Sequence, residues 1–270
     1  MSGGSGIQWT SIDAPKSIPP RWRWIGFVVA LAVVAALVAF ALIEGDKIVR
    51  GIASDVVKSG VTSALQLPEG QEVDVDLGEG LLVFQAATGS IDSVDVTIPG
   101  VTFGGAVGTL ALTVEGVSLD PSAPVDTLVA RVILDSANLS AFAGNLSSVA
   151  LTSVNIGDGV VGISADLAGQ PVTAGLVPSS VANNAVTFTP TTVAVGETAS
   201  TVEEVMAGPL APLAGPMLTS SAVCLGPYLP KSVAVTGAEV VGETLVVTAS
   251  GDDVRLAGLG TKGTCDVPAA

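Results

Sequence analysis

The sequence predicts an α+β protein in which a mostly antiparallel, strongly curved β-sheet wraps around a long amphipathic helix, preceded by one transmembrane helix. Three observations lead to this fold class. An uncharged apolar run covers residues 25–43, an amphipathic pattern follows over residues 46–66, and strand-like alternation begins at Gln71. A flat β-sandwich is the second choice, but it leaves the amphipathic segment without a role.

The apolar run Ile25–Ile43 has the length of a membrane anchor. Its nineteen residues carry no charge, and as a helix they would cover roughly 28 Å, close to the ~30 Å hydrocarbon core of a bilayer. A helix also satisfies its own backbone hydrogen bonds in lipid. Residues 1–24 contain three basic residues, Lys16, Arg21 and Arg23, against two shortly after the run, Lys47 and Arg50. The positive-inside rule therefore predicts a cytoplasmic disordered tail at 1–24 and an outward-facing domain at 46–270.

A cleaved signal peptide is the alternative to this signal anchor. Ala39-Phe40-Ala41 fits a small-x-small cleavage site, but the apolar run is longer than the usual ~7–15 residues of a signal peptide. Both interpretations place the domain outside the cytoplasm. We expect a single-pass protein of the inner (plasma) membrane, with its C-terminal domain in the periplasm or outside.

The outward-facing domain is strongly acidic. The whole chain carries −15, and beyond residue 43 seven basic residues stand against twenty-four acidic ones, a net charge of −17. Nucleic-acid binding is excluded because phosphate contacts need clustered Lys and Arg. Electrostatic adhesion to anionic lipid is disfavoured for the same reason. If the domain handles an anionic lipid, it must enclose the apolar tails.

Two cysteines, Cys224 and Cys265, are the only ones in the chain. An even count in an oxidising compartment favours a disulfide. Two free thiols are the alternative, and metal binding is disfavoured because the chain has no histidine and no short cysteine spacing.

Secondary structure follows from the periodicity. Residues 46–66 place apolar side chains three and four apart and are expected to be helical. Residues 135–146 resemble a short helix, and the prolines in 201–219 allow only short helical pieces. Alternating segments joined by short turns predict an antiparallel meander, with strands expected at 71–77, 81–85, 90–98, 107–119, 125–134, 149–156, 159–167, 171–177, 184–195, 231–236, 238–241 and 244–249.

Catalytic motifs are absent from the sequence. Without histidine there is no Ser-His-Asp triad, and no nucleophile elbow, Walker A loop or dinucleotide fingerprint occurs. Carboxylate pairs do occur, but none stands out as a facing acid pair: Asp74/Asp76, Asp92/Asp95, Glu203/Glu204 and Asp252/Asp253. We therefore expect no catalytic residues, no metal and no cofactor, and rank a carboxylate-dependent hydrolase of envelope glycans last among the functions.

Four segments, in this order, resemble the actinobacterial LmeA-like family of phospholipid-binding proteins. They are the amphipathic helix after a membrane segment, an acidic-apolar strand with the glycine-led strand that follows it, a strand that closes on Gly-Val-x-Leu-Asp, and a C-terminal Leu-Pro with a strand pair. In this chain they are Lys47–Leu67, Glu72–Leu77 with Gly89–Val96, Gly116–Asp120, and Leu229–Val235 with Gly242–Val247. Together the resemblance covers most of residues 46–255.

The resemblance implies a fold like one half of the bactericidal/permeability-increasing protein, a TULIP-like lipid-binding fold. It also implies phospholipid binding in the periplasm or at the outer face of the inner membrane, and a role in building a mycobacterial-type envelope, including lipomannan. The partners it implies are phospholipid, the inner membrane and envelope glycolipid-synthesis proteins. The poverty of the chain in basic and aromatic residues argues against direct recognition of lipid headgroups.

The leading hypothesis is therefore a membrane-anchored lipid-binding domain without catalytic activity. The alternative is a structural or interaction module of an envelope enzyme complex that binds no lipid. An open apolar groove would favour the first, and an interior filled by side chains would favour the second. The residues expected to line the groove are Ile52, Val56, Leu65, Phe84, Phe103, Leu112, Phe142 and Met217.

Overall fold

In the computed structural model, residues Asp46–Ala270 form one compact unit. The predicted tail and anchor lie outside the described part. Among the residues described, no helix is long and apolar enough to cross a membrane. Those residues are 46–63, 65, 67–78, 80, 82–103, 106–120, 122–140, 150–255 and 261–265.

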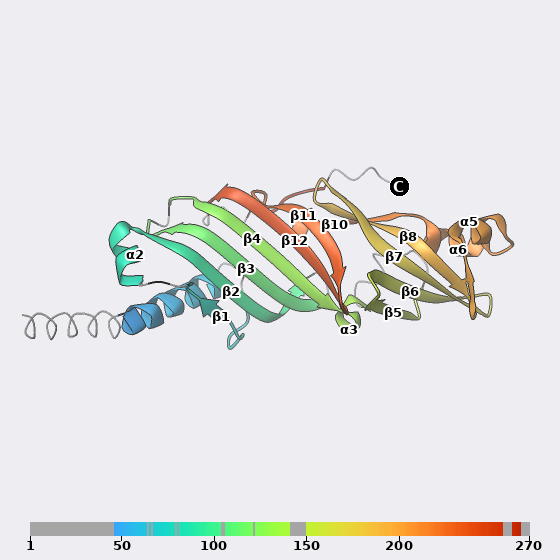
Figure 1. Ribbon diagram of the computed structural model, residues 1–270, viewed down its shortest axis with the longest axis horizontal. Helices are drawn as coiled ribbons and strands as arrows, with labels where there is room; N and C mark the ends of the chain where they lie inside the picture. The colour runs from blue at the N-terminus through green and yellow to red at the C-terminus, as the bar shows by residue number, and fades with distance from the viewer. Residues whose placement is uncertain are drawn as a thin grey trace, which may run out of the picture. The chain divides into compact units, whose positions relative to one another are not determined.

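The first sheet, sheet A, has six antiparallel strands in the order β1-β2-β3-β4-β12-β11 (Figure 1). Its first four strands follow one another as a meander. The last two come from the C-terminal region and form a hairpin, and β12 pairs with β4 along most of its length. The strands are β1 (Asp74–Asp76), β2 (Ser90–Phe103), β3 (Ala106–Ser118), β4 (Val125–Asp135), β11 (Ala234–Val241) and β12 (Thr244–Val254).

The second sheet, sheet B, is also antiparallel and six-stranded. Its order is β10-β8-β7-β6-β5, and the short β9 pairs with the far end of β8. Sheet A meets sheet B where β11 lies beside β7. The strands are β5 (Ser153–Gly157), β6 (Val160–Leu167), β7 (Gln170–Ala182), β8 (Ala185–Val195), β9 (Thr198–Ser200) and β10 (Ser221–Cys224).

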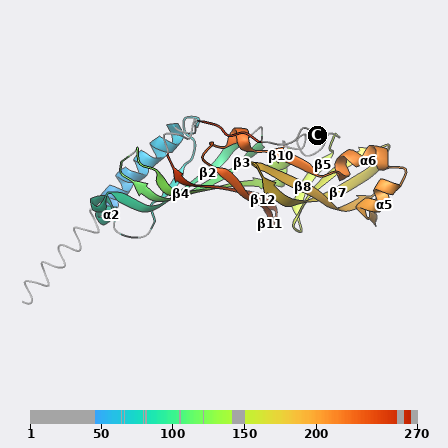
Figure 2. The same ribbon diagram turned by 90° about the horizontal axis from the view of Figure 1, so that it is seen from above.

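Each sheet carries helices on one face. A helix over residues 46–63, called here the entry helix, packs on sheet A (Figure 2). Sheet B is covered by two short helices, from which Val205 and Met217 enter its core. The remaining helical segments lie at the ends of strands. Their bounds are α2 (Leu82–Thr88), α3 (Ser136–Leu139), α5 (Val202–Ala207), α6 (Ala211–Leu218) and η2 (Gly226–Tyr228).

The structure corrects three expectations. The strands form two sheets, so the prediction of one strongly curved sheet wrapped around a long helix is wrong. The strand expected at 81–85 is instead α2, Leu82–Thr88. The two strands expected at 231–236 and 238–241 are the single strand β11, which has a register shift between Val235 and Gly237.

The predicted disulfide is confirmed. Cys224 at the end of β10 is bonded to Cys265, with 5.9 Å between their Cα atoms. The segment before Cys265 pairs with the chain that leads into β11, because Lys231 N donates to Thr261 O (2.8 Å) and Gly263 N to Leu229 O (2.9 Å). The disulfide therefore ties sheet B to the entrance of the last two strands of sheet A.

Candidate functional site

The inner face of sheet A is the face on which the entry helix packs. It carries a continuous row of apolar side chains. Directly opposed residues of antiparallel strands point to the same face. One such row runs from Ile98 to Leu110, Val132, Val247 and Ala238, crossing five strands. This row gives the face an uninterrupted apolar floor.

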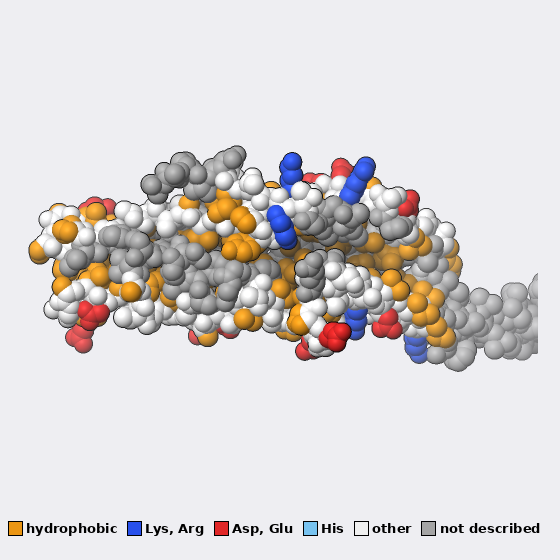
Figure 3. All heavy atoms as spheres, turned by 180° about the vertical axis from the view of Figure 1, so that it is seen from behind, with side chains coloured by type: hydrophobic (Ala, Val, Ile, Leu, Met, Phe, Trp, Pro, Cys, Tyr) orange, Lys and Arg blue, Asp and Glu red, His pale blue; other side chains and the backbone are white. Residues whose placement is uncertain are grey.

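Burial along the row is uneven. Ile98 and Leu110 are buried, but Val132, Val247 and Ala238 are only half-buried. Leu112, which lies on the same face, is also half-buried. We call Leu112, Val132, Ala238 and Val247 the seam. Figure 3 shows apolar side chains in the right half of the molecule, with charged side chains above and below them.

The seam lies where the two hydrophobic cores meet. Leu112 packs against the core of sheet A, Val247 and Ala238 pack against the core of sheet B, and Val132 packs against both. Leu229, from the loop before β11, also contacts both cores. Small or half-covered apolar side chains at such a junction form the kind of surface that takes an apolar ligand.

The entry helix covers the other part of this face. Its partly buried side chains Val49, Ala53, Val57 and Val61 are four residues apart and contact the core of sheet A. Arg50 fixes the rotation of the helix about its axis. Its guanidinium donates to Gly78 O (2.9 Å) and Gly80 O (2.7 Å), and it forms an ion pair with Asp46 (3.3 Å).

The neighbouring side of the entry helix presents apolar side chains to solvent. Ile48, Ile52 and Val56 are exposed by 66%, 62% and 66%. Phe84 on α2 is 56% exposed and Leu119, just after β3, is 53% exposed. The predicted amphipathic face thus divides into a buried side and an exposed side.

The predicted groove residues whose side chains are described lie in three different parts of the domain. Ile52, Val56 and Leu65 belong to the exposed surface around the entry helix, and Phe84 to α2. Leu112 lies in the seam, whereas Met217 is buried (1% exposed) in the core of sheet B. The side chains of Phe103 and Phe142 lie outside the described part of the structure.

The prediction from sequence did not include three of the four seam residues. Strand alternation identifies Val132, Ala238 and Val247 as inward-facing candidates. However, alternation does not say that β12 inserts between β4 and β11, and that pairing is what makes them neighbours.

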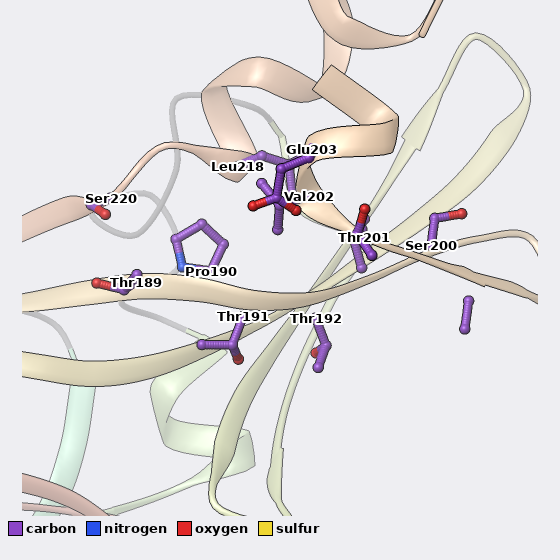
Figure 4. Close-up of a pocket in the computed structure, with 12 residues that line it drawn as sticks. Thr189, Pro190, Thr191, Thr192, Ser200, Thr201, Val202, Glu203, Leu218 and Ser220 are labelled. Carbon is purple, nitrogen blue, oxygen red and sulfur yellow. The ribbon is translucent and has the colours of Figure 1, made fainter. Parts of the chain in front are cut away.

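A second candidate is a cavity of about 430 Å³ on sheet B (Figure 4). It lies among the end of β8, β9, the start of α5 and the end of α6. Hydroxyl side chains dominate its lining, including Thr189, Thr191, Ser200 and Ser220, and Glu203 is the one ionisable residue among those that line it. A lone carboxylate gives no acid–base pair, and the hydroxyl groups make this cavity less suited to acyl chains than the apolar seam.

All four carboxylate pairs named in the sequence analysis lie at exposed positions. Asp74 and Asp76 are exposed on the short edge strand β1, and Asp95 accepts a hydrogen bond from the Thr113 hydroxyl (2.6 Å). The Ser122 hydroxyl (2.7 Å) and backbone N–H (2.9 Å) donate to Asp120 and hold the pKa of that carboxyl below its ordinary value. A general acid needs the opposite shift.

Comparison with protein families matched residues 45–250 to the family described as LmeA-like phospholipid-binding. The chain belongs to this family. A search of curated proteins returned no match, and neither did a search of solved structures. The LmeA-like family is described by a binding activity and not by an enzymatic one.

The LmeA-like region contains the entry helix, sheet B and most of sheet A. Its segments Glu72–Leu77 and Gly89–Val96 contain β1 and the first half of β2, which pair with each other. Gly242–Val247 leads into β12 and ends at a seam residue. The segments that suggested the LmeA-like family thus build the sheet that carries the seam.

Proposed function

We propose that this chain is a membrane-anchored phospholipid-binding protein that holds acyl chains along the seam of sheet A. Membership of the LmeA-like family supports phospholipid as the ligand. The observation that carries the location is the group of half-buried apolar side chains, Leu112, Val132, Ala238 and Val247, at the junction of the two cores. The protein acts as a binder and not as an enzyme.

The proposed affinity comes from apolar burial. Each methylene that leaves water contributes about 0.8 kcal/mol. A few methylene groups of one acyl chain therefore suffice for useful binding without a charge on the headgroup. This fits a domain in which the basic residues after Lys58 are Arg131, Lys231, Arg255 and Lys262, all of them exposed.

The experiment is photo-crosslinking in proteoliposomes. Full-length protein is reconstituted with a phosphatidylcholine that carries a diazirine on one acyl chain, and the modified peptides are identified by mass spectrometry. Cross-links are expected on β4, β11 and β12. The variant Ala238→Trp should lose most of them, because the indole occupies the apolar floor.

The matched control is Glu239→Trp. Glu239 is the next residue of β11, is exposed, and points to the opposite face, so it adds the same side chain without obstructing the seam. Circular dichroism checks that both variants are folded. Cross-links that are equal in the two variants, or confined to residues 25–43, would refute binding at the seam.

The wider role that we propose is in cell-envelope biogenesis, such as lipomannan maturation, at the outer face of the inner membrane. Family membership and the predicted outward-facing domain support it. Deletion of the gene should then change the lipomannan profile of the host on gels, and the wild-type chain should restore it. The Ala238→Trp variant should fail to restore it.

The second candidate function is a module that steadies an envelope enzyme complex without binding lipid. The interior of sheet B favours it, because Phe188, Met217 and Leu218 fill the space under α5 and α6. Normal lipomannan in cells that carry only Ala238→Trp would favour this second function.

A further inference from the structure

We propose that the exposed side of the entry helix, together with α2, is a surface that docks on the lipid bilayer. The surface consists of Ile48, Ile52, Val56, Phe84 and Leu119, and we call it the docking patch. The inference deepens the proposed function and rests on its membrane anchor. It adds a contact that would hold one end of sheet A against the bilayer. That bilayer would supply the phospholipid that binds at the seam.

The first observation is how these apolar side chains are grouped. The three residues on the entry helix are four residues apart, so they form one stripe about 12 Å long. Arg50 joins this helix to Gly78 and Gly80, immediately before α2, which carries Phe84. Leu119 N donates to Gly89 O (3.0 Å), just after α2. The five side chains therefore lie at one end of sheet A.

The second observation is where the chain enters the domain. The apolar run of the sequence ends at Ile43, and Ile48 follows five residues later. Even a fully extended chain covers at most about 3.6 Å per residue. Ile48 is therefore within roughly 18 Å of the end of the predicted anchor, which keeps the start of the entry helix close to the membrane surface.

The third observation is that the exposed stripe changes character along the helix. Ile48, Ile52 and Val56 occupy the half nearest the predicted anchor. On the same side, Ser59 and Ser63 continue the stripe and are exposed. Large apolar side chains thus face outward near the membrane and give way to hydroxyls away from it.

The charges near the docking patch indicate which kind of lipid surface it would contact. Lys47 directly precedes Ile48 in the chain, and Asp55 directly precedes Val56. The two are opposite in sign, while the domain as a whole is strongly acidic. Attraction to anionic headgroups therefore contributes little, and the patch would insert apolar side chains among the headgroups of a neutral bilayer. A group of large exposed apolar side chains of this kind marks membrane or protein contacts.

The test measures how close each residue lies to lipid. Because Cys224 and Cys265 are bonded to each other, an introduced cysteine provides a single labelling site. Full-length protein with Ile52→Cys, Phe84→Cys or the control Met206→Cys is labelled with an environment-sensitive fluorophore. It is then reconstituted in phosphatidylcholine vesicles with or without brominated acyl chains. Met206 is a suitable control because it is exposed on α5, which covers sheet B.

Brominated lipid should cause a marked loss of fluorescence from the labels at 52 and 84, and little loss from the label at 206. The pattern should persist at high salt. Equal quenching at all three sites would overturn the inference. A fluorescence signal that changes with the number of protein molecules per vesicle, and not with brominated lipid, would also overturn it. That result would show that the docking patch contacts a second copy of the chain.

Failure of this inference is distinguishable from failure of the proposed function. The triple variant Ile48→Ser/Ile52→Ser/Val56→Ser removes the stripe and leaves the seam intact. If docking feeds the seam, the variant should still take up photoactivatable lipid, but more slowly than the wild type. If the variant takes up lipid at the wild-type rate and its seam cross-links are undiminished, the docking patch has no role in lipid uptake. Phospholipid binding at the seam would still be supported.

Discussion

Arg50 shows how one side chain determines the orientation of a whole helix. Its hydrogen bonds to the carbonyl groups of Gly78 and Gly80 reach 28 and 30 residues along the chain. In Arg50→Ala these carbonyl groups lose their charged donor, and we expect the free energy of unfolding to fall by about 1–3 kcal/mol. Urea denaturation followed by circular dichroism measures it.

The control for this prediction is Arg131→Ala, which removes an exposed arginine from the outer face of sheet A. Its effect should stay within about 0.5 kcal/mol, as for most surface substitutions. Hydrogen exchange should also become faster in residues 46–63 of Arg50→Ala alone. Identical urea midpoints for the two variants would show that the Arg50 contacts do not hold the helix.

The same residue bears on the exposure of Ile52 and Val56, two of the predicted groove residues. Spacings of three and four residues predicted that residues 46–66 form an amphipathic helix, and residues 46–63 are helical. Those spacings cover a broad arc that includes Ile52 and Val56 as well as Val57 and Val61. Which part of the arc meets the sheet depends on contacts with residues far along the chain, so periodicity could not place Ile52 and Val56 outside.

At the scale of elements, local signals identified most strands but misassigned α2. The run Leu81–Gln85 is short and apolar, and such runs fit a buried strand or a helical turn equally well. By contrast, the prolines correctly limited residues 201–219 to short helices. Strand positions were therefore predictable from alternation, whereas short apolar runs between glycines were not.

The helix α5 depends on a capping box at its first turn. Thr201 Oγ1 accepts a hydrogen bond from Glu204 N (3.1 Å), and Glu204 Oε2 accepts one from Thr201 N (3.0 Å). Thr201→Ala should lower the free energy of unfolding by about 1 kcal/mol. Thermal denaturation measures the change, with Ser200→Ala as the neighbouring control. An equal shift in both variants would count against the capping role.

At the scale of the whole molecule, strand order was beyond the reach of the sequence. Hairpin neighbours such as β2, β3 and β4 follow from short turns. The insertion of β12 between β4 and β11 joins residues far apart in the chain, as in the pairing of Val132 with Val247, which are 115 positions apart. The division into two sheets, and therefore the seam between their cores, depends on this long-range pairing.

The disulfide was predictable from the even cysteine count together with the expected oxidising compartment, and it acts at the same scale. It closes a loop of 41 residues that contains β11 and β12. Constraining a loop of this length in the unfolded chain is worth about 4 kcal/mol in the chain-entropy model. The double variant Cys224→Ser/Cys265→Ser should therefore unfold at a lower urea concentration than the oxidised wild type.

Reductant provides the control, because it should destabilise only the chain that has a disulfide. Dithiothreitol should shift the wild-type midpoint toward that of the double variant and leave the double variant unchanged. Since the bond joins β10 to the segment paired with residues 229–231, its loss should also speed hydrogen exchange in β11 and β12, next to the seam. A fully reduced wild type with an unchanged midpoint would mean that the sheets hold together without this link.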